Sequence, residues 1–475
     1  MAGMYFFDDF ALDRRVQVER TYVQPERLSS EPYQGTNGFI TYPSVHWCPE
    51  QGCYRMWHGI ISDTATHQHV LGLAESRDCL HWQDTGYVYA GLGNVHGAIV
   101  YRDPYEQDPA QLYKMAASTS RQEASPGRED SSVVLTSPDG VTWDDAGMSR
   151  RWGEHRSDTS NCLFYNPVRD CYQILHRPVF IDRRVASTWS KDLTEWSEPE
   201  LVVHPDPLDP PCCQLYGMTA FPAEDIFIGF LLIYETDMLD LGLFKMGGRL
   251  TTELVYSYDG FHWNRTHHRV IPYPQYPDFG AGIMAVQTVT EDPSGETWKL
   301  AVSAPRLEHG VAFTKKGEML QYNDPTFAQR VAADGIDTRN NGVLIYETRK
   351  MGLVGLQGNV RSSSLCTKPI RLNSGALALN LSAPCGRATF QISDGSNTPL
   401  PGFTFDECVP FSGDSVCHEP RWQQHSLQEL QGQRIRIEIT LHMATLYAIT
   451  GDFSPYHGTG VQAGYGSPAK LEERS

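Results

Sequence analysis

Short stretches in which apolar residues alternate with polar ones, or run without interruption, fill the chain up to about residue 350. The earliest are GFITYPSVHW (38–47), CYRMWHGII (53–61) and VLGLAES (70–76), and polar turn-forming residues separate them. A period of two over such lengths is typical of β-strands, whereas an amphipathic helix has a period of 3.6. The pattern therefore predicts many short strands.

The same series of three strand-like stretches recurs four more times along the chain. The second series is GAIVYRD, LYKMAAS and SVVLTS, the third CLFYNP, CYQILHR and RVASTWS, the fourth GMTAFP, IFIGFLLIYE and ELVYS, and the fifth GIMAVQTV, TWKLAVSAP and GVLIYETR. Self-similarity at a spacing of several tens of residues is typical of repeat architectures in which each repeat is one supersecondary unit. The sequence therefore predicts five similar β-units.

A short motif, Ser-x-Asp-x-x-x-Trp, ends the series in the first four units. Its aspartates are Asp78, Asp139, Asp192 and Asp259, which lie 61, 53 and 67 residues apart. An Asp in a tight turn can accept hydrogen bonds from the backbone of that turn, and a Trp on the returning strand can pack over the sheet. We expect these aspartates to be structural, and the spacing leaves room for one four-stranded sheet per repeat.

Five four-stranded units predict a five-bladed β-propeller over residues 34–350, with the first strand of each blade lining a central channel. Residues 1–33 are expected to pack on the propeller or to supply an outer strand that closes the ring. From residue 351 to 454 the alternating segments become shorter, as in LALNL, ATFQIS and RIRIEITL, which predicts a β-sandwich. The Gly-rich and charged end, 455–475, is expected to be a flexible tail.

Composition agrees with an all-β globular protein and excludes several partners. The chain has 475 residues, with 41 Gly, 30 Pro and 23 Tyr, and its formal net charge is -18. Nucleic-acid affinity comes largely from Lys and Arg that neutralise phosphates, so we expect no nucleic-acid or acidic-membrane partner. No apolar run approaches the length of a membrane span, and the start of the chain lacks the pattern of a secretion signal, which predicts a cytoplasmic protein.

Several segments resemble the five-bladed furanosidase superfamily, glycoside hydrolase families 32, 43, 62 and 68, and most closely an uncharacterised bacterial family-32-like group. The matching segments are FFDDFALDR at the start, YRMWHG, VYRDP, DTSNCLFYNP and PGFTFDECVPFSGDS. The resemblance implies the propeller-plus-sandwich architecture and a carbohydrate substrate. Characterised family 32 enzymes carry a Trp-x-Asn-Asp-Pro-Asn-Gly box and a Glu-Cys motif in the propeller, which this chain lacks.

The tripeptide Arg102-Asp103-Pro104 looks like the transition-state-stabilising triplet of that superfamily. Here, however, it follows the first strand of the second unit instead of opening that strand. Two interpretations of Asp103 stay open: a turn-forming Asp-Pro, or a contact with the substrate.

Hydrolysis of a glycoside needs two carboxyl groups, one protonated and one ionised. In a propeller the ligand lies at one mouth of the channel, so candidates come from the starts of the innermost strands and from the loops after the second strands. Asp158, in Asp-Thr-Ser-Asn, is the predicted base or nucleophile. Glu308 and Glu235 compete for the role of acid, and Asp278 is predicted to tune a pKa or to orient the sugar.

The same rule selects residues that would bind the substrate. They are Asn37, His96, Asn161 and Tyr216 at strand starts, His58, Arg177, Arg306 and His309 after second strands, and Asp103 through the resemblance. No cofactor is required for this chemistry and no metal-ligand spacing is evident, although a structural calcium or sodium ion in the channel is compatible with the fold.

Three functions stay open from the sequence. The first is a glycosidase acting on a furanoside or a related small glycoside. The second is a glycoside phosphorylase or transglycosidase on the same fold, for which Arg177, Arg306 and His309 offer the cationic pocket that phosphate needs. The third is a non-catalytic carbohydrate-binding propeller, because fold alone does not fix function.

Overall fold

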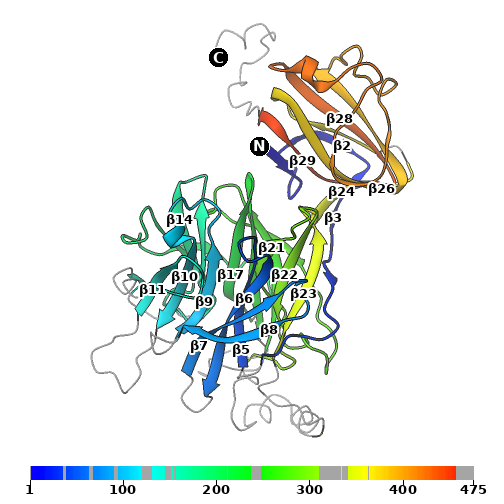
Figure 1. Cartoon of the computed structure of the whole chain (residues 1–475). Helices are drawn as coiled ribbons and strands as arrows, with labels where there is room; N and C mark the ends of the chain where they lie inside the picture. The colour runs from blue at the N-terminus through cyan, green and yellow to red at the C-terminus, as the bar shows by residue number, and fades with distance from the viewer. Residues whose placement is uncertain are drawn as a thin grey trace. The chain divides into compact units, whose positions relative to one another are not determined.

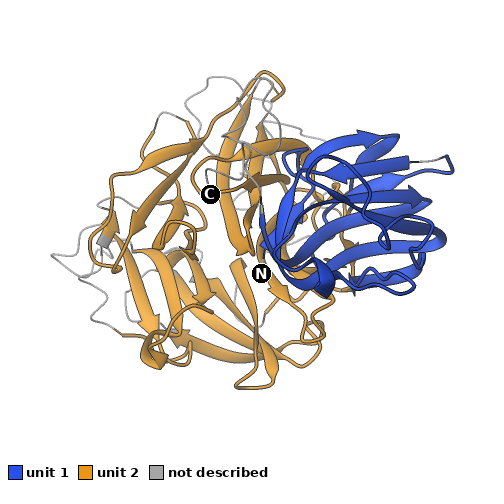
Figure 2. Cartoon of the chain, turned by 90° about the horizontal axis from the view of Figure 1, so that it is seen from above, with its two compact units in different colours: residues 1–23, 349–475 blue, residues 24–348 orange. Residues whose placement is uncertain are grey.

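A computed structural model describes residues 2–35, 39–63, 68–89, 95–119, 131–144, 151–153, 157–180, 182–210, 212–236, 248–309, 333, 341–361 and 363–455. The chain divides into two compact units (Figure 2): residues 24–348, and residues 1–23 together with 349–475. Strands dominate both units, which confirms the all-β prediction. No helix within these ranges is long and apolar enough to cross a membrane.

Five four-stranded antiparallel sheets form the larger unit and stand in a ring (Figures 1 and 2). Blade one contains β5 (Phe39–Cys48), β6 (Cys53–Asp63), β7 (Gln68–Ser76) and β8 (Gln83–Tyr89). Blade two contains β9 (Val95–Arg102), β10 (Tyr113–Thr119), β11 (Ser131–Ser137) and β12 (Arg151–Gly153). Blade three contains β13 (Cys162–Asn166), β14 (Cys171–His176), β15 (Val185–Ser190) and β16 (Glu200–Val203). Blade four contains β17 (Cys213–Ala223), β18 (Ile226–Thr236), β19 (Gly248–Ser257) and β20 (Asn264–Arg269).

The fifth blade closes the ring with a strand from the other end of the chain. Its first three strands are β21 (Ala285–Glu291), β22 (Thr297–Ser303) and β23 (Val343–Arg349), and the fourth is β4 (Glu26–Arg27). Each first strand contacts the first strand of the next blade, and β21 contacts β5. The five-bladed propeller is thereby confirmed, and its innermost strands are β5, β9, β13, β17 and β21.

The four Ser-x-Asp motifs have one geometry in the structure. In each, the Asp carboxylate accepts hydrogen bonds of 2.7–3.0 Å from the backbone N–H groups two and three residues further on. The Ser hydroxyl lies 2.9–3.2 Å from the same carboxylate oxygen. All four aspartates therefore serve to close the turn after the third strand.

The smaller unit is a single sheet of nine strands around one hydrophobic core that includes Leu379, Phe390 and Ile439. Its strands are β1 (Ala2–Tyr5), β2 (Leu12–Val16), β3 (Val18–Tyr22), β24 (Val354–Gly358), β25 (Ser363–Thr367), β26 (Ile370–Asp394), β27 (Phe411–His418), β28 (Arg434–His442) and β29 (Ala444–Pro455). The sheet is consistent with the predicted C-terminal sandwich. The segment 1–33 is divided: β1 to β3 belong to this sheet, and β4 to the propeller.

The hydrogen bonds to the motif aspartates predict how the stability of the fold changes at acid pH. Partial burial works to raise the pKa of Asp139, but hydrogen bonds from the Thr142 and Val141 backbone and from Ser137 lower that pKa below its usual value. A group with a depressed folded-state pKa stabilises the fold above its unfolded pKa of about 3.9, and this contribution is lost as the pH falls through the folded value. We expect Asp139→Asn to lower the unfolding temperature at pH 7. Between pH 5 and pH 2 the unfolding temperature of this variant should fall less than that of the wild type.

The control for this measurement is Glu296→Gln, at an exposed position whose side chain makes no hydrogen bond to any described residue. Thermal unfolding followed by circular dichroism at each pH compares the two variants with the wild type. An Asp139→Asn curve that runs parallel to that of Glu296→Gln would contradict the assignment.

Candidate active site

The antiparallel blades bring the starts of the first strands and the ends of the second strands to the same end of the ring. His96 is the second residue of β9, Asp158 lies four residues before β13, and Tyr216 lies near the start of β17. Arg177 directly follows β14, and His309 follows β22. Five residues that the sequence singled out thus come from blades two to five and meet at one end of the propeller.

Two glycines let the segment before β13 approach its neighbours. A Cβ atom on Gly97 would lie 1.9 Å from the carbonyl oxygen of Thr159, and one on Gly217 would lie 2.3 Å from the Thr159 hydroxyl oxygen. The backbone N–H of Asn161 donates a 2.9 Å hydrogen bond to the carbonyl of Gly97. Because Gly97 follows His96, this close contact brings His96 to Asp158. Gly217 follows Tyr216, which Arg177 links to Asp158.

In four of the blades, the pairing between the first and second strands is irregular near the start of the first strand. In β17 the register to β18 shifts between Leu215 and Gly217, so Tyr216 is an extra residue with no cross-strand partner. Comparable shifts occur in β5, β9 and β21. Bulges of this kind bend a strand and turn a side chain out of its regular direction, and they are frequent next to active sites.

The carboxylate of Asp158 lies between two basic side chains. Its Oδ1 atom is 2.9 Å from Nε2 of His96, and its Oδ2 atom is 3.5 Å from Nη1 of Arg177. The Asp158 side chain is 48% exposed, whereas the side chains of His96 and Arg177 are 8% and 11% exposed. A half-exposed carboxylate is therefore held in place by two largely buried groups.

Buried serines fix the backbone around this carboxylate. The Ser157 N–H donates to the Ser118 hydroxyl at 3.0 Å, and the Arg177 N–H donates to the Ser157 hydroxyl at 3.1 Å. Both serines are at most 2% exposed. The segment before β13 is thereby tied to β10 on one side and to the end of β14 on the other, which limits the movement of Asp158.

Contacts between cations and aromatic rings extend from Asp158 and Arg177 in blade three through Tyr216 to His309 in blade five. We call these residues, together with His96, the contact chain. The Arg177 guanidinium lies 4.3 Å from the centre of the Tyr216 ring and donates to the Tyr216 carbonyl at 2.7 Å. The Tyr216 hydroxyl is 2.9 Å from Nε2 of His309. Arg183 lies 5.3 Å from the Tyr216 ring and 4.9 Å from the Tyr234 ring. Burial, together with the neighbouring Arg177 charge, lowers the pKa of Arg183 below its usual value.

Blade five contributes a second carboxylate. Glu308 precedes His309, is 33% exposed and lies 3.7 Å from Nε of Arg249. The Arg306 guanidinium lies 3.9 Å above the Phe279 ring. Asp278, next to Phe279, is exposed and lies in the segment before β21. The loops before β21 and after β22 therefore carry Asp278, Arg306 and Glu308 at the same end of the propeller as Asp158.

Asp103, Glu235 and His58 lie away from this contact chain, and Asn37 lies outside the described residues. Asp103 is fully buried at the opposite end of β9 from His96 and forms a 2.9 Å ion pair with the equally buried Lys114. Glu235 pairs with Arg269 of the outermost strand of blade four, at 3.0 Å. His58 is buried against the Tyr33 ring, and this burial lowers its pKa to about 4.

These positions bear on the two interpretations of Asp103. Asp103 has no exposed surface; its Oδ2 atom contacts Lys114 and the Tyr172 hydroxyl, and its Oδ1 atom accepts from the Tyr105 N–H, so it cannot touch a substrate in this conformation. The structure therefore favours the structural interpretation. A buried Lys of this kind is rare unless it is paired, and nothing in the stretch LYKMAAS except its surrounding apolar residues signals it.

Three further residues near the candidate site, Arg183, Thr159 and His69, were not predicted from the sequence. The His69 ring lies 4.7 Å from that of His96, edge to face. A signal for Arg183 was present, because it follows β14 in the same loop as Arg177. Thr159 carried no signal, because its role depends on two glycines from other blades.

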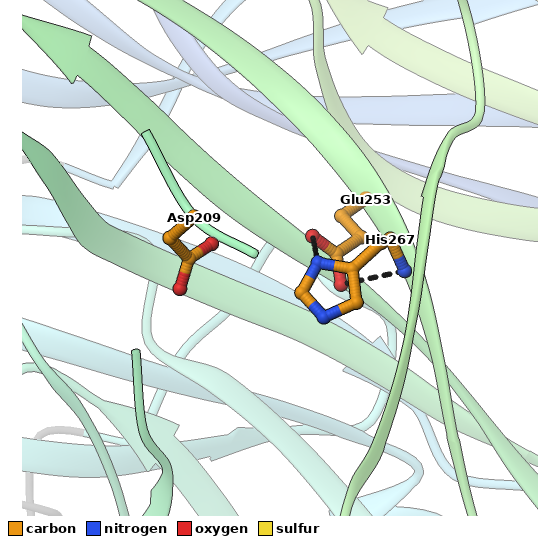
Figure 3. Close-up of side chains that lie close together, drawn as sticks. All are labelled: Asp209, Glu253 and His267. Atoms are coloured by element: carbon orange, nitrogen blue, oxygen red, sulfur yellow. Dashed lines mark hydrogen bonds and ion pairs between the residues drawn. The ribbon is translucent and has the colours of Figure 1, made fainter. Parts of the chain in front are cut away.

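A compact group of possible metal ligands, Asp209, Glu253 and His267, lies in blade four (Figure 3). The Arg265 guanidinium bonds both carboxylates, at 2.6 Å to Asp209 and 2.7 Å to Glu253, and Arg269 lies 2.9 Å from Glu253. Because two cations already neutralise these carboxylates, the group is best described as an ion-pair network that ties β19 to β20.

Comparisons with known proteins concern the fold. No family model and no curated protein matches the chain. A thermostable family-43 glycoside hydrolase is 10% identical, with a TM-score of 0.44, over 67% of this chain and 92% of its own. A glycosyl hydrolase from Bacteroides ovatus is 11% identical (TM-score 0.45, 68% and 94%). An N-acetylgalactosamine deacetylase from F. plautii is 13% identical (TM-score 0.44, 70% and 96%). At these values the likeness carries no argument about the reaction.

The close approach at Gly97 can be tested with a matched pair of glycines. Gly97 and Gly52 both have a φ of +63°, but an added Cβ meets backbone at Gly97 and nothing within 4 Å at Gly52. A left-handed conformation costs an alanine about 1–2 kcal/mol, and overpacking adds about 1–3 kcal/mol. We expect Gly97→Ala to lower the free energy of unfolding clearly more than Gly52→Ala in denaturant titrations; equal losses would contradict the packing described here.

Proposed function

We propose that the protein is a glycoside hydrolase whose reaction centre is Asp158. The supporting observation is the half-exposed Asp158 carboxylate between His96 and Arg177, at the end of the propeller where the first strands begin. In this proposal Asp158 acts in its ionised form, as the base that activates water or as the nucleophile that attacks the sugar. His96 and Arg177 hold the carboxylate in position.

Glu308 takes the role of the acid in this proposal. It adjoins His309, which contacts Tyr216 and thus the same contact chain as Asp158, whereas Glu235 is engaged by Arg269. The Arg249 guanidinium lies 3.7 Å from the Glu308 carboxylate. Because the Arg249 side chain is exposed, an entering sugar can displace it from Glu308. Substrate binding would then leave the Glu308 carboxyl group facing the sugar.

A small glycoside suits the residues around Asp158. Arg177 and His309 offer hydrogen-bonding groups beside the Tyr216 ring, and His96 lies beside Asp158. Sugars bind where apolar ring faces and a few fixed polar groups occur together. We propose a furanoside or a related small glycoside as the substrate, in keeping with the sequence resemblance, with Asp278 orienting the sugar from blade five.

Phosphorolysis is the second candidate, and one observation favours it. Arg177 and Arg183 both lie over the Tyr216 ring, at 4.3 and 5.3 Å from its centre. Two guanidinium groups held so close repel each other, and a bound phosphate would relieve this repulsion. In that case phosphate, and not water, would receive the sugar.

Paired carboxylate variants test the hydrolase. Removal of a general acid or base slows catalysis by about 10²- to 10⁴-fold. On a panel of nitrophenyl furanosides and pyranosides and sucrose-type oligosaccharides, we expect Asp158→Asn and Glu308→Gln each to lose activity in this range with unchanged unfolding temperatures. Asp182→Asn is the control, because Asp182 lies in the loop after β14 and pairs with Arg184. Full activity in Asp158→Asn, or no turnover of any substrate by the wild type, would reject the proposal.

Phosphate dependence separates the two candidates. If water is the acceptor, sugar release is unaffected by added inorganic phosphate and the product is the free sugar. If phosphate is the acceptor, the rate rises with phosphate, a sugar phosphate accumulates, and Arg183→Met raises the KM for phosphate about tenfold or more through loss of a charge-assisted contact. Chromatography of the products decides between these outcomes.

A further inference from the structure

A groove of about 640 Å³ lies where blades three and four meet, away from the candidate active site. Blade three lines it with Arg169, Trp189, Lys191 and Glu200, and blade four with Phe261 and Trp263. We call it the rim groove. Its volume is in the range of ligand-binding pockets, which is roughly 300–1,000 Å³.

The rim groove and Asp158 lie at opposite ends of blade three. β13 is five residues long; Asp158 precedes its first residue, and Arg169 follows its last. At about 3.3 Å per residue the two ends of this strand are roughly 13 Å apart. The turn motif of blade four, which supplies Phe261 and Trp263, lies at the groove end as well, because the Asn166 amide donates to the Asp259 carbonyl at 2.8 Å. A ligand in the rim groove therefore does not touch Asp158.

Trp189 is exposed where the blade does not require a tryptophan. It is 39% exposed, while the other residues of β15 are buried, and its indole N–H donates to no described residue. The residue at the same place in the other three motifs, directly before the Ser, is Glu75, Thr136 or Tyr256. These equivalent residues show that the fold accepts small, charged or aromatic side chains at this position. Together with the half-buried Phe261 and Trp263, Trp189 forms an aromatic surface along one groove, and exposed apolar patches of this kind are typical of contact surfaces.

The polar side chains of the rim groove have mixed charge. Arg169 lies 3.1 Å from the Asp259 carboxylate and 5.7 Å from the centre of the Phe261 ring. Lys191 lies 3.3 Å from the Asp170 carboxylate. Glu200 is exposed and forms no ion pair with the described residues. Because both cations already have acidic partners, the rim groove does not favour an anion, and it offers hydrogen-bond donors and an acceptor around aromatic surfaces.

We infer that the rim groove binds a segment of a neutral carbohydrate chain, with Trp189 stacked on the apolar face of a sugar ring. Aromatic rings beside hydroxyl-binding groups such as Glu200 and Arg169 suit a ligand that has apolar ring faces and polar edges. No catalytic carboxylate pair is needed for this binding. The choice of a carbohydrate over a peptide rests on the proposed function.

Native gels that contain soluble arabinan, levan, xylan or β-mannan test this inference on the full chain. We expect at least one polysaccharide to retard the wild type and Asp158→Asn alike. Trp189→Ala should bind at least tenfold more weakly, and Glu200→Gln several-fold more weakly. Tyr87→Ala is the control, because Tyr87 is a 52% exposed aromatic residue on β8, outside the rim groove, and this variant should be retarded like the wild type.

Several outcomes would overturn the inference. These are no retardation by any polysaccharide, equal retardation of Trp189→Ala and the wild type, or loss of retardation in Asp158→Asn alone, which would assign binding to the candidate active site. Binding of a proline-rich peptide to the rim groove without any polysaccharide binding would also overturn it. Trp189→Ala should keep the wild-type rate on nitrophenyl glycosides, so failure of the hydrolase proposal and failure of this inference are separate results.

Discussion

The close packing of the segment 157–161 against the first strands of blades two and four is the constraint on which the candidate active site depends. Gly97 and Gly217 leave room for Thr159, and each glycine directly follows a residue of the site. A side chain at Gly97 would push the segment away from His96, and one at Gly217 would push it away from Tyr216. The site is therefore a consequence of how near three blades approach one another, and not of any one blade.

Acidic residues in this propeller fall into three environments with different consequences. The motif aspartates accept backbone hydrogen bonds in turns, and Asp103 and Glu253 are buried against Lys114 and Arg265. In both environments the carboxylate is fully engaged by the protein. Asp158 differs, because its basic partners are largely buried while it is itself half-exposed. Two largely buried basic partners, more than exposure, separate Asp158 from the motif aspartates, since the Asp78 side chain is itself 50% exposed.

The repeated motif made the fold predictable from the sequence, because each copy marks the same turn and the intervening strands alternate regularly. The same regularity predicted which strand ends meet, and hence the grouping of His96, Asp158, Arg177, Tyr216 and His309. Local pattern could not assign β1 to β3 to the C-terminal sheet, since β2 is polar and mostly exposed. It also could not separate Glu235 from Glu308, because their arginine partners come from other strands.

A crystal structure with a bound, non-hydrolysable glycoside would test the central claim most directly. We predict that the sugar ring lies between Asp158 and Glu308, with the two carboxyl groups about 5–5.5 Å apart for a retaining enzyme or about 6.5–9.5 Å apart for an inverting one. A sugar bound elsewhere, or carboxyl groups separated by clearly more than about 10 Å in the complex, would contradict a two-carboxylate hydrolase centred on Asp158.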